Sequence, residues 1–166
     1  MQPALAYNYG MPLLVDGHNL IGKLPDISFS DPDKEARLIA LLRRYCGRTN
    51  RKVTVVFDRG APAGHWPSGS SKLEVVFAPT SRTADEIIIR RIAQSRNPAG
   101  LVVVSSDGEV AAAALARRAH SRRAEDFARE LAALAAQSGS SGRDRQLSAD
   151  EVAEWEAIFR NRDEHG

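Results

Sequence analysis

The chain has 166 residues, of which 43% are hydrophobic, and this is enough for one domain with a substantial core. Its 23 Lys and Arg residues nearly balance its 21 Asp and Glu residues, so the formal net charge is +2 and attraction to nucleic acid requires local clustering of basic side chains. Cys46 is the only cysteine, which excludes an intramolecular disulfide and a zinc ribbon and fits a reducing compartment. No apolar run approaches the ~20 residues of a membrane-spanning helix, and residues 1–10 lack the pattern of a signal peptide, so we expect a soluble cytoplasmic protein with no membrane partner.

The order of predicted elements favours a parallel α/β sheet. Short apolar runs predict four strands, at residues 13–15, 53–57, 73–77 and 101–104. Helical patterns between and after them predict four helices, over residues 32–46, 83–96, 109–119 and 123–136. Asp31 is the expected cap of the first helix and Gly47 its end, while Thr83 and Glu86 have the spacing of a capping box. Strands that alternate with helices form a parallel sheet with right-handed crossovers.

The sequence also predicts how the chain is divided. Residues 1–10 have no pattern and are expected to be an extension outside the domain, which we place at residues 11–137. A Ser/Gly run favours a flexible linker at residues 138–147. Residues 148–166 then contain an amphipathic helix with Trp155 in its apolar stripe. We expect this helix to dock back on the domain, and the alternative is a surface for another chain or a ribosome.

Acidic side chains follow the predicted strands on the side where a parallel sheet forms its functional crevice. Asp16 follows the first strand, Asp58 the second and Asp107 the fourth. The third strand leads to Asp85 and Glu86 in the first turn of a helix. Carboxylates without cysteine, and with few histidines, suit Mg²⁺ or Mn²⁺ rather than zinc. Such a cluster is typical of sites that hydrolyse phosphodiesters.

Each of these acids also has a local explanation. Asp16, Asp58 and Asp107 precede tight loops and could form Asx turns. Asp85 and Glu86 suit the positive end of a helix dipole, and the capping box already explains Glu86. The convergence of several acids on one edge is a stronger indication than any single one.

Four segments together resemble the NYN/YacP-like branch of the PIN-like nuclease superfamily, whose bacterial members include ribosome-associated mRNA endonucleases. They are LLVDGHNLI at residues 13–21, VVFDRG at 55–60, SRTADEIII at 81–89 and VVVSSD at 102–107. The resemblance covers about residues 12–134 and implies a three-layer PIN-like or Rossmannoid α/β domain, with a mainly parallel central sheet flanked by helices.

The resemblance also implies roles for individual residues. Asp16, Asp85 and Asp107 would be the metal ligands or their close supports, and Asn19 would orient water, metal or phosphate. Asp58, Glu86 and Ser106 are expected to support this catalytic set. His18 and Ser106 depart mildly from the family pattern, and His18 is expected either to contact a phosphate or base or to pack in its loop.

Basic and aromatic residues supply candidate contacts for single-stranded RNA. The long segment between the second and third strands contains Arg59 and Trp66 and ends near Lys72, and Arg82 precedes the second helix. Trp66 could stack on an unpaired base, with the basic side chains on backbone phosphates. Alternatively, the Trp66 side chain packs onto the domain itself.

A second basic cluster lies in the predicted turn between the last two helices. It consists of Arg117, Arg118, Arg122 and Arg123. These side chains could meet RNA phosphates, or they could be an ordinary charged surface.

These features favour a metal-dependent endoribonuclease that cleaves single-stranded RNA, with mRNA on the ribosome as one candidate substrate, and leaves 5′-phosphate and 3′-hydroxyl ends. A non-catalytic RNA- or ribosome-binding module is the alternative. A small-molecule phosphohydrolase ranks lowest, because the segment after the first strand lacks the two-apart acid pair of an aspartyl-phosphate mechanism.

Overall fold

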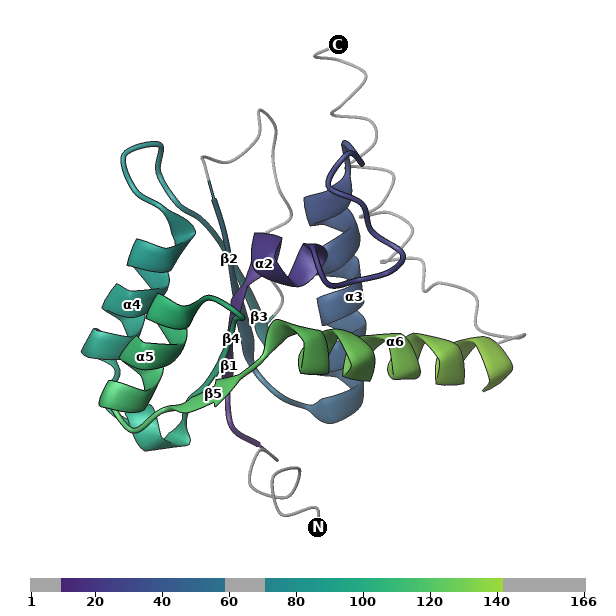
Figure 1. Ribbon diagram of the computed structural model, residues 1–166. Helices are drawn as coiled ribbons and strands as arrows, with labels where there is room; N and C mark the ends of the chain where they lie inside the picture. Colours follow the sequence, from purple (N-terminus) through teal and green to yellow (C-terminus); the bar gives the residue numbers. More distant parts are fainter. Residues whose placement is uncertain (1–9, 59–70, 142–166) are drawn as a thin grey trace.

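The computed structural model describes residues 10–58 and 71–141, and these ranges form one five-stranded sheet. All pairings are parallel, and the strand order is β3-β2-β1-β4-β5 (Figure 1). The strands are β1 (Leu13–Asp16), β2 (Val53–Phe57), β3 (Leu73–Phe77), β4 (Val102–Val104) and β5 (His120–Arg122). The expected α/β fold with a parallel central sheet is confirmed.

The strand order puts a topological switch point beyond the end of β1. In register, Leu13 of this central strand aligns with Val53 of β2 and with Val102 of β4. The chain first adds β2 and β3 on one side of β1 and then returns to add β4 and β5 on the other side. Open parallel sheets bind ligands where such connections diverge, outside the carboxyl ends of the strands. We call this side of the sheet the carboxyl edge and the other side the amino edge.

Helices cover both faces of the sheet, which gives the expected three layers (Figure 1). Helices α3 and α6 lie on one face, and helices α4 and α5 lie on the other. The helices are α2 (Gly17–Ile21), α3 (Lys34–Thr49), α4 (Ala84–Gln94), α5 (Gly108–Ala116) and α6 (Ala124–Ser141), with a 3₁₀ turn at Pro98–Gly100. None of the described helices combines the length and apolar composition needed to cross a membrane.

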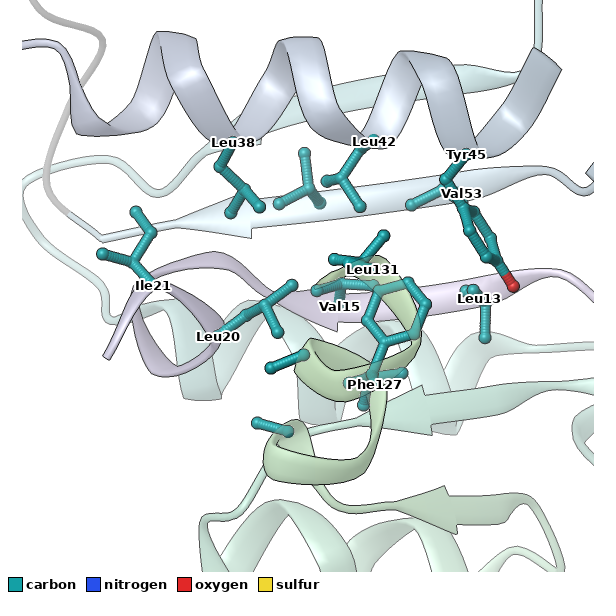
Figure 2. Close-up of a cluster of buried hydrophobic side chains, with 14 of the residues drawn as sticks. Leu13, Val15, Leu20, Ile21, Leu38, Leu42, Tyr45, Val53, Phe127 and Leu131 are labelled. Atoms are coloured by element: carbon teal, nitrogen blue, oxygen red, sulfur yellow. The ribbon is translucent and has the colours of Figure 1, made fainter. Parts of the chain in front are cut away.

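Alternate side chains of β1 pack into the two halves of the core, one on each face of the sheet. Leu13 and Val15 pack with α3 and α6, whereas Leu14 packs with α4 and α5. Figure 2 shows the first cluster, in which Tyr45 and Phe127 meet edge to face with ring centroids 5.1 Å apart. Because β1 is buried on both faces, its sequence is a continuous apolar run rather than an alternating one.

Helix α3 differs from its prediction at both ends. It runs through Gly47, which is exposed, and ends at Thr49, followed by the C-cap residue Asn50, whose φ of 60° is left-handed and whose N–H donates to the Cys46 carbonyl. A glycine inside a helix costs only about 1 kcal/mol, which the burial of the apolar stripe outweighs. At the other end, Asp33 rather than Asp31 is the residue before the first helical turn. The Asp31 carboxylate instead accepts hydrogen bonds from the Ser28 N–H and Arg37.

The fifth strand was not predicted, and the turn expected between the last two helices contains it. Helix α5 ends at Ala116, the chain reverses at Arg118 with φ of 62°, and His120–Arg122 then pair with β4 alone. A polar edge strand carries no apolar run, so the sequence pattern does not reveal it. Helix α6 also continues to Ser141, so the first residues of the expected linker are helical. The rest of the linker and the expected C-terminal helix lie outside the described residues.

Candidate active site

Asp16 lies at the centre of the carboxyl edge and is almost completely buried, with 5% of its surface exposed. It ends β1 and caps the short helix α2, because one carboxylate oxygen accepts the Asn19 N–H at 3.4 Å. The other oxygen accepts a hydrogen bond from the Ser105 hydroxyl at 3.4 Å. The local explanation considered for Asp16 therefore holds, but two long hydrogen bonds do not satisfy a buried carboxylate well.

A second carboxyl group, that of Asp85, lies within hydrogen-bonding reach of Asp16. Burial raises the pKa of Asp16 from 3.8 to about 7, and the negative charges of Asp85 and, more weakly, Asp58 act in the same direction. Burial also raises the pKa of Asp85, together with the charge of Asp107, although its hydrogen bond with Asp16 opposes this rise. Two carboxyl groups this close cannot both ionise freely, so the pair retains a proton near neutral pH unless a cation replaces it.

The position of Asp85 is set by the start of α4. Thr83 and Glu86 form the predicted capping box, with the Glu86 N–H donating to the Thr83 hydroxyl at 3.2 Å and the Thr83 N–H donating to the Glu86 carboxylate at 3.1 Å. Asp58, at the end of β2, accepts the Ala84 N–H at 2.6 Å. Asp58 thus ties the first turn of α4 to the end of β2, while Glu86 closes the cap of the same helix.

The loop after β4 is held to Asp16 and Asn19. The Ser105 hydroxyl donates to Asp16 and accepts the Asp107 N–H at 3.1 Å, while the Ser106 N–H donates to the Asn19 side-chain oxygen at 2.9 Å. Asp107 caps α5 by accepting the N–H groups of its first turn. Asn19 is therefore already engaged with the protein through its oxygen, and it fixes the relative positions of α2 and this loop.

At the carboxyl edge, the acids suit a divalent cation as one close pair, Asp16 and Asp85, and not as a group of three ligands. Among residues 10–58 and 71–141, no three His, Cys, Asp or Glu side chains are arranged to hold a metal ion. The expected set of Asp16, Asp85 and Asp107 is present as a close pair, with the charge of Asp107 acting on Asp85. Magnesium commonly binds through one or two carboxylates and keeps several waters, so the donor chemistry of the pair suits it.

A close approach of the backbone to an aromatic ring explains the glycine that follows Asp16. A Cβ atom at Gly17 would lie 2.4 Å from Cε1 of Phe57 and 3.1 Å from a methyl group of Val55. The Phe57 ring is itself fully buried and stacks on Phe77 with centroids 5.2 Å apart, so it cannot move aside cheaply. Only glycine lets the chain turn here from β1 into α2.

The sequence model of the YacP-like NYN domain family matches residues 13–160, which include all of these acids. The chain belongs to this family. The family is part of the PIN-like nuclease superfamily, so the resemblance carried by the four sequence segments is confirmed. The matched region also includes the segment after residue 137 that the sequence pattern separates from the domain.

Individual relatives of this NYN domain agree with the assignment. YacP of Bacillus subtilis (strain 168) is 37% identical over 90 residues, which are 51% of this chain and 52% of that protein. The chain thus matches only about half the length of this curated relative. The crystal structure of Rae1 (YacP) from Bacillus subtilis superimposes with a TM-score of 0.64 at 24% identity, covering 92% of this chain and 90% of that one. A second crystal structure, of a tryptophan-to-leucine mutant of Rae1, gives a TM-score of 0.63 at 25% identity, covering 92% and 96%.

The candidate RNA contacts of this NYN domain are dispersed over the molecule. Arg59 and Trp66 lie outside the described residues. Lys72 directly precedes β3 and so lies at the amino edge, away from the acids. Arg82 is exposed in the loop before α4, at the carboxyl edge.

The second basic cluster is divided by β5. Arg117 and Arg118 follow α5 at the amino edge, and Arg117 donates to the Ala93 carbonyl at 3.1 Å. Arg122 is half-buried, pairs with Glu130 and covers the Phe127 ring. Of the four arginines, Arg123 alone combines a place at the carboxyl edge with high exposure, 74% of its side chain. The cluster seen in the sequence is therefore not one surface, because a strand crosses the sheet between its two halves.

Glu35 belongs to this site although the sequence did not single it out. Its carboxylate lies 2.9 Å from Nε2 of His18, while Nδ1 of His18 accepts the Asp58 N–H at 3.2 Å. Since Nδ1 accepts a backbone proton, Nε2 carries the ring proton and donates it to Glu35. Burial acts to raise the pKa of Glu35, but the hydrogen bond from His18 and the charge of Lys34 lower it overall. His18 thus packs beside Phe57, which is close to one of its two expected roles, although it does so from helix α2 rather than from a loop.

Glu125 is a second acid that the sequence did not single out. It accepts a 2.5 Å hydrogen bond from the Ser106 hydroxyl and pairs with Lys23 at 3.3 Å and Arg123 at 3.4 Å. The hydrogen bond from Ser106 is the largest of several contacts that lower the pKa of Glu125 to about 2. Its position in the first turn of α6 is explained by the helix dipole alone, so nothing in the sequence marked it.

Proposed function

We propose that this chain is a metal-dependent endoribonuclease that cleaves single-stranded RNA at the carboxyl edge, with Mg²⁺ or Mn²⁺ as its cofactor. The observation that supports this most is the pairing of the buried Asp16 with Asp85 at the topological switch point, where burial and neighbouring negative charge raise the pKa of both carboxyl groups. Family membership adds the general class, an RNA-cleaving hydrolase of a nuclease superfamily.

We assign each residue of the site a role in this reaction. Asp16 and Asp85 would hold the cation, with Asp107 contributing charge beside Asp85. When bound, the cation supplies neutralisation of the phosphate and activation of a water. Asn19 and Ser105 fix the position of the Asp16 side chain relative to the loop after β4. Asp58 fixes the first turn of α4 and thereby Asp85.

The proposal is tested with a labelled single-stranded RNA and the full-length chain. We expect cleavage with Mg²⁺ or Mn²⁺, loss of cleavage with EDTA, and a loss of at least about 100-fold in the Asp16→Asn variant, because carboxylate ligands cannot be replaced by an amide without loss of charge. Asp26→Asn is the matched control, since Asp26 is exposed in the loop after α2. Undiminished cleavage in EDTA and in Asp16→Asn would overturn the mechanism.

Metal binding has a readout that does not depend on cleavage. Because the pair retains a proton near neutral pH, Mn²⁺ has to displace it, and proton release should accompany binding. Calorimetric titration of Mn²⁺ at about pH 6.5 in two buffers with different heats of ionisation measures this release. We expect proton release with the wild type and none with Asp16→Asn.

The same assays distinguish the alternative functions. RNA binding without cleavage under every metal would support a non-catalytic binding module instead. Faster cleavage of mRNA on translating ribosomes than of the same RNA alone would extend the proposal to a ribosome-bound substrate.

A further inference from the structure

Two large hydrophobic side chains are exposed among the described residues, and they lie at opposite edges of the sheet. Leu115, 64% exposed, is near the end of α5 and hence at the amino edge. Phe29, 57% exposed, belongs to the loop between α2 and α3. Helix α2 starts at the end of β1 and α3 begins on the same side, so Figure 1 shows this loop beyond the carboxyl ends of the strands. Phe29 therefore lies on the same side of the molecule as the acid pair.

The Phe29 ring rests on the backbone of Gly22. A Cβ atom at position 22 would lie 2.9 Å from Cε2 and 3.2 Å from Cζ of the ring. A side chain at this position would displace the ring. One part of Phe29 is thus supported by glycine while more than half of its surface remains in solvent.

Hydrogen bonds on both sides of Phe29 hold the loop in place. The Ser28 N–H donates to Asp31 at 2.9 Å, and Arg37 of α3 donates to the same carboxylate oxygen at 2.8 Å. The hydroxyl groups of Ser28 and Ser30 are 2.8 Å apart and hydrogen-bonded. A ring presented from a fixed loop loses little conformational entropy on binding. Its polar neighbours are unlike the apolar core of a protein–protein interface.

Two cations connect this ring to the acidic site. Lys23 follows Gly22, and Lys23 and Arg123 both pair with Glu125. Glu125 in turn accepts the Ser106 hydroxyl, one residue before Asp107. The side chains of Lys23 and Arg123 are 38% and 74% exposed, and one carboxylate does not neutralise both. Two positive charges and an exposed ring beside a candidate nuclease site match how proteins bind single strands, with cations on phosphates and rings on bases.

We propose that Phe29 stacks on a base of the single-stranded RNA, and that Lys23 and Arg123 hold the phosphates between this base and the acid pair. This inference rests on the proposed function for the kind of ligand, and it adds a path for the strand across α2. Phe29 and Lys23 are assigned here as RNA contacts, and Arg123 is the one member of the second basic cluster that joins them.

The test is RNA binding by the full chain carrying Asp16→Asn, so that cleavage does not interfere. Fluorescence anisotropy of a labelled oligoribonucleotide gives Kd. Phe29→Ala should weaken binding by about 5- to 100-fold, Phe29→Trp should retain it, and the matched control Leu115→Ala should leave it unchanged. Lys23→Gln and Arg123→Gln should each lower the slope of log Kd against log salt by about 0.7.

A series of oligoribonucleotides with one abasic site at successive positions separates stacking from a structural effect. With Phe29 present, one position should weaken binding more than its neighbours, and in Phe29→Ala the same position should make no further difference. Unchanged Kd in Phe29→Ala, or equal sensitivity of both proteins to every abasic site, would overturn the inference. If RNA is cleaved while Phe29→Ala binds like the parent, the inference alone fails. If Phe29 stacks but no metal supports cleavage, the proposed function alone fails.

Discussion

Replacing Asp16 by asparagine should stabilise the metal-free protein, and more so as the pH rises. The pKa of Asp16 is raised to about 7 from 3.8, so the folded state binds more protons than the unfolded state between these values. The unfolding free energy therefore falls as the pH rises through this window. The full loss of unfolding free energy that comes from ionising the buried Asp16 is reached above about pH 7. At about 1.36 kcal/mol per pKa unit, it amounts to about 4 kcal/mol at most.

An amide at this position keeps the oxygen that caps α2 and removes the buried charge. The stability difference between Asp16→Asn and wild type should increase by roughly 2–3 kcal/mol from about pH 5 to about pH 8. Urea denaturation in EDTA at both pH values measures it, with Asp26→Asn as the control. Adding Mn²⁺ at the higher pH should stabilise the wild type and not the variant. A difference that does not change with pH, or a variant less stable than wild type at the higher pH, would refute the argument.

Three further substitutions test contacts around the site. Thr83→Ala should lower the unfolding free energy by about 1 kcal/mol, measured in urea, because it removes the hydroxyl of the capping box. Gly17→Ala should cost about 1–3 kcal/mol and reduce cleavage, because the new methyl group overlaps the Phe57 ring. Glu35→Ala should lower kcat about 10-fold with little change in KM, because it releases His18 and with it the Asp58 backbone.

Each of these has a matched comparison in the chain. Thr80→Ala changes an exposed threonine in the loop before α4 and should leave stability within about 0.5 kcal/mol of wild type. Gly47→Ala adds a methyl group with nothing within 4 Å, inside a helix, and should be neutral or stabilising. Glu35→Gln keeps an acceptor for His18 and should retain most of kcat. Equal losses in Glu35→Ala and Glu35→Gln would show that the charge, not the hydrogen bond, is what the site needs.

The parts of the fold that the sequence predicted are those that one segment determines alone. Strands β1, β2 and β4 are buried on both faces, so each is an apolar run that can be recognised without its neighbours. The acids of the site follow such runs directly, and a parallel sheet brings the ends of its strands to one edge. The capping box at Thr83 is likewise a local signal.

The parts that were missed depend on contacts between distant segments. Strand β5 is polar because it is an outermost strand of the sheet, and only its pairing with β4 makes it a strand. Glu35 joins the site through His18, 17 residues away, and Glu125 does so through Ser106, 19 residues away. The arginines around β5 looked like one cluster because sequence proximity conceals the strand that separates them.

On the proposed function, Asp16 and Asp107 serve both the active site and the scaffold, and this has a consequence for how such a domain can change over evolutionary time. Both carboxylates cap helices, and Asp58 bonds the first turn of a third helix, in each case through an oxygen that accepts a backbone N–H. Asparagine offers the same oxygen and is an equally good cap. If the acids act as proposed, single-base changes from aspartate to asparagine would abolish cleavage one position at a time without destabilising the scaffold. Descendants that have lost cleavage yet still fold, and still present the same outer surface to RNA, are accessible by very short mutational routes.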